Sequence, residues 1–379
     1  MTRALRVLHI VSGDLWAGAE VQAFTLMSHL ARMPETRIAA VLMNDQTLAD
    51  RLRSIGISPH VLDEQKIHPF AMFFKLRTVL RSWQPDVLHT HRQKENVLGA
   101  LANRSSGNVP SVRTVHGASE FAGVKGWRGV RNRLLTNLDH MCGRALQQRV
   151  IAVTNELGLR LREEFPVEKI AVIENGVDFE RMRIEKGVAE YRAAEPDARH
   201  IGIAGRLVAV KRMDLFIETA ALLLTEHSEV NWRFHVFGEG PMRPSLEELS
   251  SRLGMRGRVV FHGHRQDMAT CVSGLDVLLI CSDHEGMPMI SLEAAALGVP
   301  VVAHAVGGLV EVVPEEFLVS RHAASAYKDG VLRALCEDGR AIAASRAVET
   351  AARFSAQRNA ARIRALYEEV LGERNDHGG

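Results

Sequence analysis

Short apolar runs rich in β-branched residues alternate with longer amphipathic segments along most of the chain. Residues 6–12 (RVLHIVS), 37–43 (RIAAVLM) and 86–91 (DVLHTH) have the length and composition of buried strands. The segments between them, such as 19–33 (AEVQAFTLMSHLARM), repeat apolar residues at the spacing of one helix face. Strands that alternate with helices in this way form parallel sheets covered by helices on both faces. The pattern therefore predicts an α/β fold built from doubly wound parallel sheets.

The alternation occurs in two series, separated by the charged, alanine-rich segment 179–200 (FERMRIEKGVAEYRAAEPDARH). The second series starts at 200–207 (HIGIAGRL) and continues through 277–282 (VLLICS). The length of 379 residues exceeds the roughly 250–300 at which a single core stops growing. We therefore predict two Rossmann-like domains, residues 1–180 and 199–355, joined by a linker, with a helical segment at 351–372.

Composition excludes several classes of protein. The net charge of +2, from 47 basic and 45 acidic residues, does not favour a general nucleic-acid binder. Four scattered cysteines, which we interpret as small core residues, suit a reducing cytosol. No stretch approaches the roughly 18 uncharged apolar residues of a membrane span. We expect a cytoplasmic protein, soluble or peripheral on the inner face of the membrane.

Two glutamates eight positions apart, Glu285 and Glu293, lie in the stretch SDHEGMPMISLEAAALGVPVVA (282–303). Ser282 and Glu285 fit a helix capping box, but Pro288 disfavours a helical Met287 and predicts that the helix starts at Pro288. Glu285 then lies in a loop at the carboxyl edge of the sheet, where open α/β folds bind ligands.

The same loop predicts an anion or hydroxyl site. The N–H groups of Gly286, Met287 and Met289 precede or open a helix, whose dipole favours negative charge. Glu293 stands among apolar residues, and a buried carboxylate needs hydrogen-bond donors such as sugar hydroxyls. The alternative is that Glu293 is a solvated surface residue.

A second loop, IAGRLVAVKRMD (203–214), carries Gly205, Arg206 and Lys211 after a predicted strand. Two cations at this edge could neutralise a diphosphate without a divalent metal. Ordinary surface charge is the competing interpretation.

In the first half, Gly18 and Glu20 follow the first strand in DLWAGAE (14–20), but the Gly-x-Gly-x-x-Gly dinucleotide fingerprint is absent. His116 follows another strand and could line a cleft, although a lone histidine is more often structural. The pairs His89/His91 and His262/His264 have no carboxylate or thiol at ligand spacing, so no metal site is predicted. No Gly-x-Ser-x-Gly elbow of a hydrolase occurs.

Residues 124–149 (VKGWRGVRNRLLTNLDHMCGRALQQR) are strongly basic and interleaved with apolar residues. Lysine and arginine occur at six positions against one aspartate: Lys125, Arg128, Arg131, Arg133, Arg144 and Arg149, with Asp139. A basic amphipathic helix could rest on anionic lipid or bind an anionic acceptor. An ordinary solvated helix is equally compatible with the pattern.

Together these motifs resemble glycosyltransferase family 4, retaining enzymes that use nucleotide sugars and have two Rossmann-like domains facing across a cleft, the GT-B fold. EGMPMISLEAAALGVPVVA resembles the family's Glu-x7-Glu signature, and GRLVAVKRMD its diphosphate motif. WAGAE, TVHG (114–117) and NGVD (175–178) also match, with Ala17 where a second glycine is usual. The stretch PEEFLVSRHAASAYKDG (314–330) departs from the pattern by being shorter, which concerns the far edge of the second domain.

The resemblance implies roles for these residues. Arg206 and Lys211 would hold the donor diphosphate, Glu293 the ribose, and Glu285 the transferred sugar. His116 and the Gly18 loop would line the cleft from the acceptor side, so His116, Glu285, Arg206 and Lys211 form the expected catalytic set. The expected donor-binding set is Gly18, Gly205, Arg206, Lys211, Gly286, Met287, Pro288, Met289 and Glu293. The helix 356–379 would pack back on the first domain.

The expected function is transfer of one sugar from a nucleoside-diphosphate sugar to a lipid-linked or polysaccharide acceptor in cell-envelope biosynthesis. No metal cofactor, no nucleic acid and a possible anionic membrane contact are expected. The alternatives are a nucleotide-sugar epimerase on the same fold and a catalytically silent nucleotide-sugar-binding protein.

Overall fold

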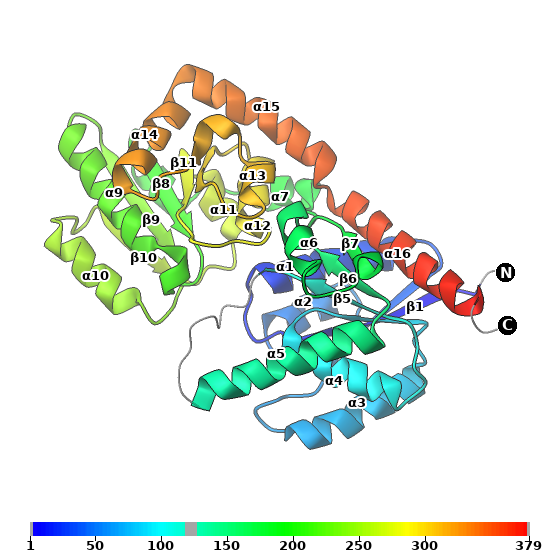
Figure 1. The fold of residues 1–379 in the computed structure, drawn as a ribbon. Helices are drawn as coiled ribbons and strands as arrows, with labels where there is room; N and C mark the ends of the chain where they lie inside the picture. Colours follow the sequence, from blue (N-terminus) through cyan, green and yellow to red (C-terminus); the bar gives the residue numbers. More distant parts are fainter. Residues whose placement is uncertain (1–2, 118–126, 377–379) are drawn as a thin grey trace. The chain divides into compact units, whose positions relative to one another are not determined.

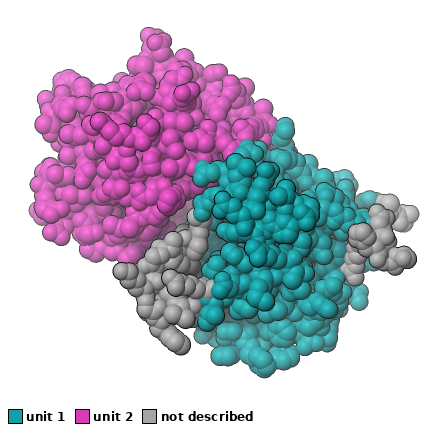
Figure 2. Space-filling model, viewed as in Figure 1, with its two compact units in different colours: residues 1–176, 356–379 teal, residues 177–355 magenta. Residues whose placement is uncertain are grey.

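The computed structural model describes residues 3–117 and 127–376 and divides into two compact units (Figures 1 and 2). Unit 1 comprises Met1–Gly176 with Ala356–Gly379, and unit 2 comprises Val177–Ser355. Each unit contains one parallel sheet with helices on both faces, so the predicted α/β architecture of two Rossmann-like domains is confirmed. Among the helices within these residues, none is long and apolar enough to cross a membrane.

The sheet of unit 1 has seven parallel strands in the order β3-β2-β1-β4-β5-β6-β7. These are β1 (Leu5–Val11), β2 (Thr36–Leu42), β3 (His60–Val61), β4 (Val87–Thr90), β5 (Ser111–Val115), β6 (Arg149–Ala152) and β7 (Ile170–Val172). The helices are α1 (Gly18–Arg32), α2 (Thr47–Ser54), α3 (Pro69–Trp83), α4 (Gln93–Arg104), α5 (Trp127–Leu146), α6 (Asn155–Leu161) and α16 (Ala356–Asp376).

Alternation along the strands gives the sheet of unit 1 a buried core on each face. Val7 belongs to the core that α1 and α16 cover, whereas its neighbour Leu8 belongs to the core under α3. Helix α16 packs against α1 (Figure 1). It buries Ile363, Tyr367 and Val370 in the first of these cores. Helix α16 is therefore an integral part of unit 1.

The sheet of unit 2 has six parallel strands in the order β10-β9-β8-β11-β12-β13. These are β8 (Arg199–Ala204), β9 (Trp232–Phe237), β10 (Val259–Gly263), β11 (Val277–Ile280), β12 (Val301–His304) and β13 (Leu318–Val319). The helices are α7 (Phe179–Glu185), α8 (Glu190–Ala194), α9 (Met213–Glu226), α10 (Arg243–Arg252), α11 (Met268–Ser273), α12 (Met289–Ala296), α13 (Leu309–Val312), α14 (Ala324–Leu335) and α15 (Glu337–Arg353). The shortened stretch after β12 supplies β13, an edge strand of two residues.

Three details differ from the sequence-based expectations. Segment 179–200, expected as a linker, contains α7 and α8, which belong to unit 2. The helical segment 351–372 is two helices, because α15 ends at Arg353 and α16 begins at Ala356. Cys336 is exposed rather than in the core, and its Sγ accepts a hydrogen bond from the N–H of Gly339 at the start of α15. The other three cysteines are buried, as expected.

Candidate functional site

Two loops meet at the carboxyl edge of the sheet in unit 2. One follows β8 and contains the Gly205–Arg212 segment, and the other follows β11 and leads into α12. Strands β8 and β11 are hydrogen-bonded neighbours, so their following loops emerge side by side. The N–H of Asp283 donates to the carbonyl of Val210 at 2.8 Å, which joins the loops directly. The motifs around Gly205 and Glu285, about 80 positions apart in the sequence, thus form one local structure at the carboxyl edge of the sheet.

An ion pair connects the predicted site residues of these loops. Lys211 Nζ lies 2.6 Å from Glu285 Oε1, and the hydroxyl of Ser282 donates to the same oxygen at 2.6 Å. The side chain of Glu285 is only 9% exposed. A charge-assisted hydrogen bond in so enclosed a place holds both groups in position. The Ser282–Glu285 contact here is a bond within the loop, since α12 begins only at Met289.

Helix α12 begins one residue later than predicted. Pro288 is its N-cap, with extended backbone, and Met289 is the first helical residue. Met287 and Met289, on either side of Pro288, are both buried, at 4% exposure. The loop containing Glu285 and Gly286 therefore has a fixed path into the helix.

Glu293 lies in the second turn of α12 and is half-buried. Burial raises its pKa to about 7, with a further increase from Glu185 and a decrease from Arg181. Those two residues lie on α7 and form an ion pair of 2.6 Å. A hydrogen-bond donor that approaches this carboxylate would therefore stabilise its charged form.

Three glycines that were not among the predicted site residues, Gly238, Gly307 and Gly308, also lie at the carboxyl edge of the unit 2 sheet. A Cβ at Gly307, whose φ is +56°, would lie 1.9 Å from the carbonyl oxygen of Glu285. The N–H of Gly308 donates to the carbonyl of Gly286 at 2.7 Å. Gly205 is approached in the same way, since a Cβ at Gly238 would lie 1.9 Å from its carbonyl oxygen. The Gly-Gly pair after β12 was the available signal in the sequence.

Arg206 is exposed directly after Gly205, at the carboxyl end of β8. Its neighbour Lys211 is one-quarter exposed. Both cations thus stand at the loop edge of unit 2, the position predicted from the sequence.

In unit 1, the Gly18 loop leads to a buried carboxylate. Gly18 is the first residue of α1 and is exposed, while Glu20 in the same turn is fully buried. Arg92, which follows β4, contacts both carboxyl oxygens of Glu20, at 2.9 and 3.0 Å, and also Asp14 at 3.2 Å. Burial raises the pKa of Glu20 to about 7. Arg92 and Asp14 were not selected from the sequence, because only the adjacency of β1 and β4 brings them together.

His116 is the end of a chain of hydrogen-bonded imidazoles. Its Nε2 lies 3.3 Å from His91 Nδ1, and His91 Nε2 lies 3.1 Å from His9 Nδ1. His89 stacks on His91 with ring centroids 4.4 Å apart. Burial lowers the pKa of all four residues, so these imidazoles are neutral at physiological pH. We call His9, His89, His91 and His116 the histidine cluster.

Part of the histidine cluster has the spacing of a metal site, since ligand atoms of His9, His89 and His91 lie within 4.8 Å of one another. Most of these atoms have protein partners, however. His89 contacts the hydroxyl of Tyr367 at 2.6 Å and that of Thr114 at 2.8 Å, and His91 lies between His9 and His116. Among the ring nitrogens of His9, His89 and His91, only Nε2 of His9 has no hydrogen-bond partner. One available nitrogen does not chelate an ion, so the geometry fits a hydrogen-bonded core better than a metal centre.

The basic stretch 124–149 is described only in part. Lys125 lies outside the described residues, as do the side chains of Arg128, Arg131 and Arg133 on α5. Arg144 Nε donates to the carbonyl of Glu164 at 2.5 Å, and Arg149 pairs with Glu369 and Glu373 on α16. These two arginines therefore serve contacts within unit 1.

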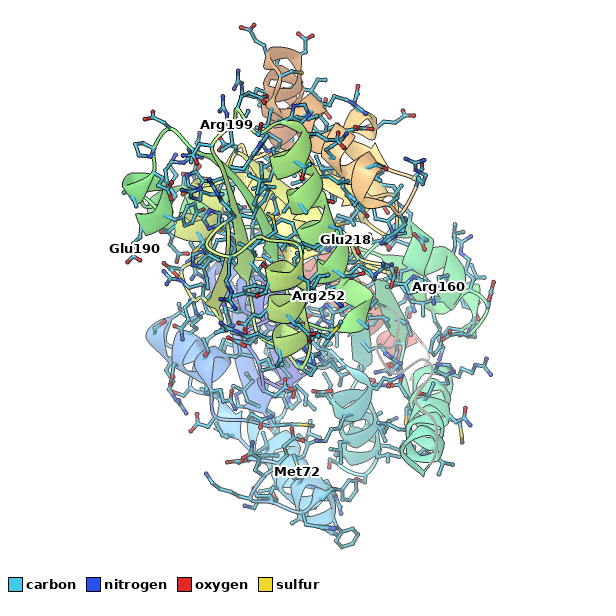
Figure 3. All side chains as sticks on the ribbon, turned by 90° about the vertical axis from the view of Figure 1, so that its left-hand side faces the viewer. Met72, Arg160, Glu190, Arg199, Glu218 and Arg252 are labelled. Carbon is cyan, nitrogen blue, oxygen red and sulfur yellow. The ribbon has the colours of Figure 1, made fainter. Side chains whose placement is uncertain are left out.

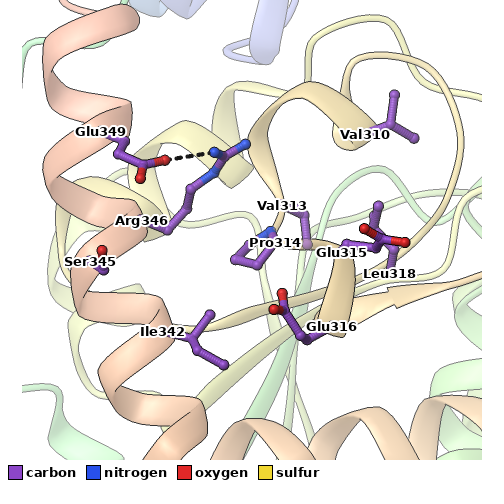
Figure 4. A pocket seen from close by; sticks show the side chains of 10 residues that line it. All are labelled: Val310, Val313, Pro314, Glu315, Glu316, Leu318, Ile342, Ser345, Arg346 and Glu349. Carbon is purple, nitrogen blue, oxygen red and sulfur yellow. Dashed lines mark hydrogen bonds and ion pairs between the residues drawn. The ribbon is translucent and has the colours of Figure 1, made fainter.

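A pocket in unit 2 lies elsewhere, between the α13–β13 segment and α15 (Figure 4). Its lining includes the carboxylates Glu315, Glu316 and Glu349, and its arginine, Arg346, pairs with Glu349 at 2.8 Å. An excess of negative charge disfavours a diphosphate there. None of the predicted site residues lines it.

Comparison with known proteins identifies the family. Residues 16–181 match the family described as Glycosyltransferase Family 4, and residues 198–337 match Glycosyl transferases group 1. A D-inositol 3-phosphate glycosyltransferase of Thermobispora bispora is 30% identical over 307 residues, which cover 76% of this chain and 71% of that protein. The chain belongs to glycosyltransferase family 4.

Three further proteins are similar to this family 4 glycosyltransferase. An Escherichia coli UDP-Gal:alpha-D-GlcNAc-diphosphoundecaprenol alpha-1,3-galactosyltransferase is 27% identical, covering 71% of this chain and 70% of that protein. The crystal structure of Anabaena HepE in complex with UDP has a TM-score of 0.80 at 19% identity, covering 96% of this chain and all of that one. The sucrose-phosphate synthase of Thermosynechococcus elongatus has a TM-score of 0.79, also at 19% identity, with 97% and 100% coverage. These structures share the fold, and the predicted family and enzyme class are confirmed.

Proposed function

We propose that this glycosyltransferase moves a sugar, with retention of anomeric configuration, from a nucleoside-diphosphate sugar to a lipid-linked or saccharide acceptor. The observation that carries the proposal is the junction of the two loops in unit 2. There the ion pair of Lys211 and Glu285 joins a cationic loop to the loop before α12.

The donor would lie along this edge. Arg206 and Lys211 would bind the diphosphate, with the backbone of Gly205 close by, and their fixed charges make a divalent metal unnecessary. The loop from Gly286 through Pro288 to Met289 would present the backbone N–H groups of Gly286, Met287 and Met289 beside the phosphates. Glu293 would accept hydrogen bonds from the ribose hydroxyls, which would offset the unfavourable burial of its charge.

Glu285 would face the transferred sugar. When the diphosphate binds, it competes for the ammonium of Lys211, and this would release Glu285 Oε1 to sugar hydroxyls. Diphosphate binding would thus break the Lys211–Glu285 pair. The freed carboxylate of Glu285 could then orient the transferred sugar.

The chemical step would need no covalent intermediate with the protein. The bond between the anomeric carbon and the phosphate oxygen breaks, and its electron pair stays on the phosphate, where Arg206 and Lys211 stabilise the charge. The acceptor hydroxyl oxygen bonds to the anomeric carbon on the same face, and its proton passes to the departing phosphate. His116, with the Gly18 loop, would orient the acceptor.

The relatives guide the choice of acceptors. One acts, by its name, on D-inositol 3-phosphate and another on a sugar linked to diphosphoundecaprenol. We extend the second type to this enzyme, and we infer that it would work in envelope polysaccharide synthesis on the inner face of the membrane.

The test has two stages. Thermal-shift screening of uridine, guanosine and adenosine diphosphates and their sugars identifies the donor, because binding to the folded state raises the melting temperature. The radiolabelled donor is then incubated with polyprenyl-diphosphate sugars and with inositol phosphate, with and without EDTA. A labelled acceptor, unaffected by EDTA and with the donor's anomeric configuration, is the expected product. An epimerised but untransferred sugar would establish the epimerase, and binding without turnover of any pair would establish a silent binding protein.

A further inference from the structure

A histidine that was not among the predicted site residues holds the loop that contains Glu285. His304 is the last residue of β12, which pairs with β11. Its Nδ1 lies 2.9 Å from the carbonyl oxygen of Ser282, in the loop after β11. A carbonyl oxygen only accepts hydrogen bonds, so Nδ1 of His304 carries the hydrogen of this bond. Ser282 is only 1% exposed, and its carbonyl depends on this donor because water has little access to it.

Ser282 also contacts Glu285, through its side chain. Its hydroxyl donates to Glu285 Oε1 at 2.6 Å, the same oxygen that Lys211 Nζ contacts at 2.6 Å. The backbone of Ser282 is thus tied to the end of β12 while its side chain is tied to the carboxylate. The imidazole of His304 therefore fixes the residue from which one of these two bonds originates.

Two other residues of the loop are tied to neighbouring segments by backbone hydrogen bonds. The N–H of Asp283 donates to the carbonyl of Val210, and the carbonyl of Gly286 accepts from the N–H of Gly308. The bond from His304 differs because its donor is a side chain. A substitution can therefore remove it and leave the backbone bonds of the loop in place.

The ring of His304 is itself held by His322, which follows β13. The two rings meet edge to face with centroids 4.1 Å apart, and His322 Nδ1 lies within 3.3 Å of both ring nitrogens of His304. Since Nδ1 of His304 is the donor to Ser282, Nε2 of the neutral ring is bare and can accept from His322. Hydrogen bonds thus run from His322 through His304 and Ser282 to Glu285.

We propose that His304 is a positioning residue for the transfer reaction: it fixes Ser282, and Ser282 orients Glu285 toward the transferred sugar. The proposal rests on the role proposed above for Glu285. In the donor-free protein Lys211 also holds Glu285, but a bound diphosphate would draw Lys211 away. The hydroxyl of Ser282 would then keep the carboxylate in place at the stage when the orientation of the sugar matters. Loss of the His304 bond should therefore affect turnover rather than diphosphate binding.

The test compares two variants of His304. H304F keeps a planar ring without the donor, whereas H304N offers an amide N–H near the position of Nδ1. We expect H304F to lower kcat about tenfold, because a small displacement of a group at the reacting centre has a large effect on rate. The affinity for the nucleoside diphosphate, measured by calorimetry, should change less than about twofold. H304N should recover most of kcat.

A double-variant cycle tests whether His304 acts through Ser282. S282A removes the hydroxyl and keeps the carbonyl that His304 contacts, and it should lower kcat about as much as H304F. The double variant S282A/H304F should be no slower than either single variant, because both substitutions act on the same support of Glu285. Additive losses would overturn the proposal, and so would a wild-type kcat in H304F or in S282A.

The matched control is H200F. His200 Nε2 lies 2.8 Å from the carbonyl oxygen of Glu195, which is the same kind of bond in the same unit. His200 follows Arg199, labelled in Figure 3, at the start of β8, whereas the site loops follow the carboxyl ends of the strands. Because His200 is fully buried, H200F should lower the urea midpoint at least as much as H304F and leave the kcat of the folded protein unchanged. An equal loss of kcat in H200F and H304F would show a general effect of destabilisation and would refute the positioning role.

Two further variants keep the outcome decisive. Should H304F be too unstable to assay, H304Q takes its place, since its amide lies one bond further along the side chain than that of H304N, and the same loss of kcat is expected. Glu285→Gln separates this proposal from the proposed function. A lowered kcat in Glu285→Gln with a wild-type kcat in H304F refutes the positioning alone, whereas a wild-type kcat in Glu285→Gln refutes the role of Glu285 itself.

Discussion

Replacing Glu293 by glutamine should stabilise the protein at alkaline pH while weakening donor binding. The pKa of Glu293 is raised from its ordinary 4.5 to about 7, chiefly by burial. Between these values the folded state holds a proton that the unfolded chain releases, so this group's contribution to stability falls as pH rises from about 4.5 to 7. Above pH 7 the fold carries the full cost of an ionised, desolvated carboxylate.

The magnitude follows from the shift. A difference of about 2.5 pKa units corresponds to roughly 3 kcal/mol, and since Glu293 is half-buried, water screens part of it, leaving about 1–3 kcal/mol. The amide keeps the shape of the side chain without its charge. We therefore expect E293Q to raise the urea midpoint at pH 8 and to have little effect at pH 4.5, whereas E248Q, which removes an exposed carboxylate of α10, should change neither.

Donor binding should show the opposite effect. If the ribose binds the ionised carboxylate, titration calorimetry should give an affinity for the nucleoside diphosphate about tenfold higher at pH 8 than at pH 6, because roughly one-tenth of the side chain is ionised one unit below its pKa. E293Q should bind weakly with no such dependence. A glutamine variant that is less stable than wild type at pH 8, or that keeps the pH dependence of binding, would refute this reasoning.

The remaining predictions concern the loops and the histidines. Lys211→Ala should weaken binding of the nucleoside diphosphate at least tenfold by calorimetry, while Glu285→Gln should chiefly lower kcat; comparable donor affinity in wild type and Lys211→Ala would contradict the assignment. Gly307→Ala should cost more than about 2 kcal/mol in urea unfolding and impair donor binding, because its Cβ would overlap the carbonyl of Glu285, whereas Gly298→Ala, also at positive φ but facing open space, should cost only about 1 kcal/mol; equal costs would argue against the overlap. Stability should fall as pH falls below about 6.5, because burial lowers the pKa of the histidine cluster and the unfolded chain then binds more protons; an unchanged urea midpoint between pH 7.5 and 5.5 would count against neutral buried imidazoles.

Much of the fold could be predicted from periodicity. Buried parallel strands read as short apolar runs, and each run that was predicted as a strand proved to be one, because a strand covered on both faces must be apolar throughout. The strands β3, β7 and β13, of two or three residues, were not predicted, since so short a segment has no periodic pattern. The break between α15 and α16 was also missed, because Phe354 and Ser355 carry no glycine or proline signal.

The sequence predicted a site residue where a side chain of suitable chemistry lies at a position that can be recognised locally, such as a loop after a strand. Glu293 was visible because charges are rare within apolar runs, and Glu285 because Pro288 leaves it in the loop before a helix. Gly205, Arg206 and Lys211 were visible because they lie in the loop after a strand. The sequence could not reveal the partner of each group. Lys211 and Glu285 are 74 positions apart, and Arg92 and Glu20 are 72 apart.

The sequence alone therefore determined the α/β class, the number of units and the residues whose chemistry suits a nucleotide sugar. These features depend on local composition and on the spacing of apolar residues, which the linear chain contains in full. Only the tertiary structure decided that Lys211 pairs with Glu285, that Gly307 lies against the Glu285 carbonyl, and that His116 ends a chain of buried imidazoles. Each of these depends on which strands become neighbours in the sheet, because adjacency brings distant loops to one edge and burial there sets the protonation of their side chains.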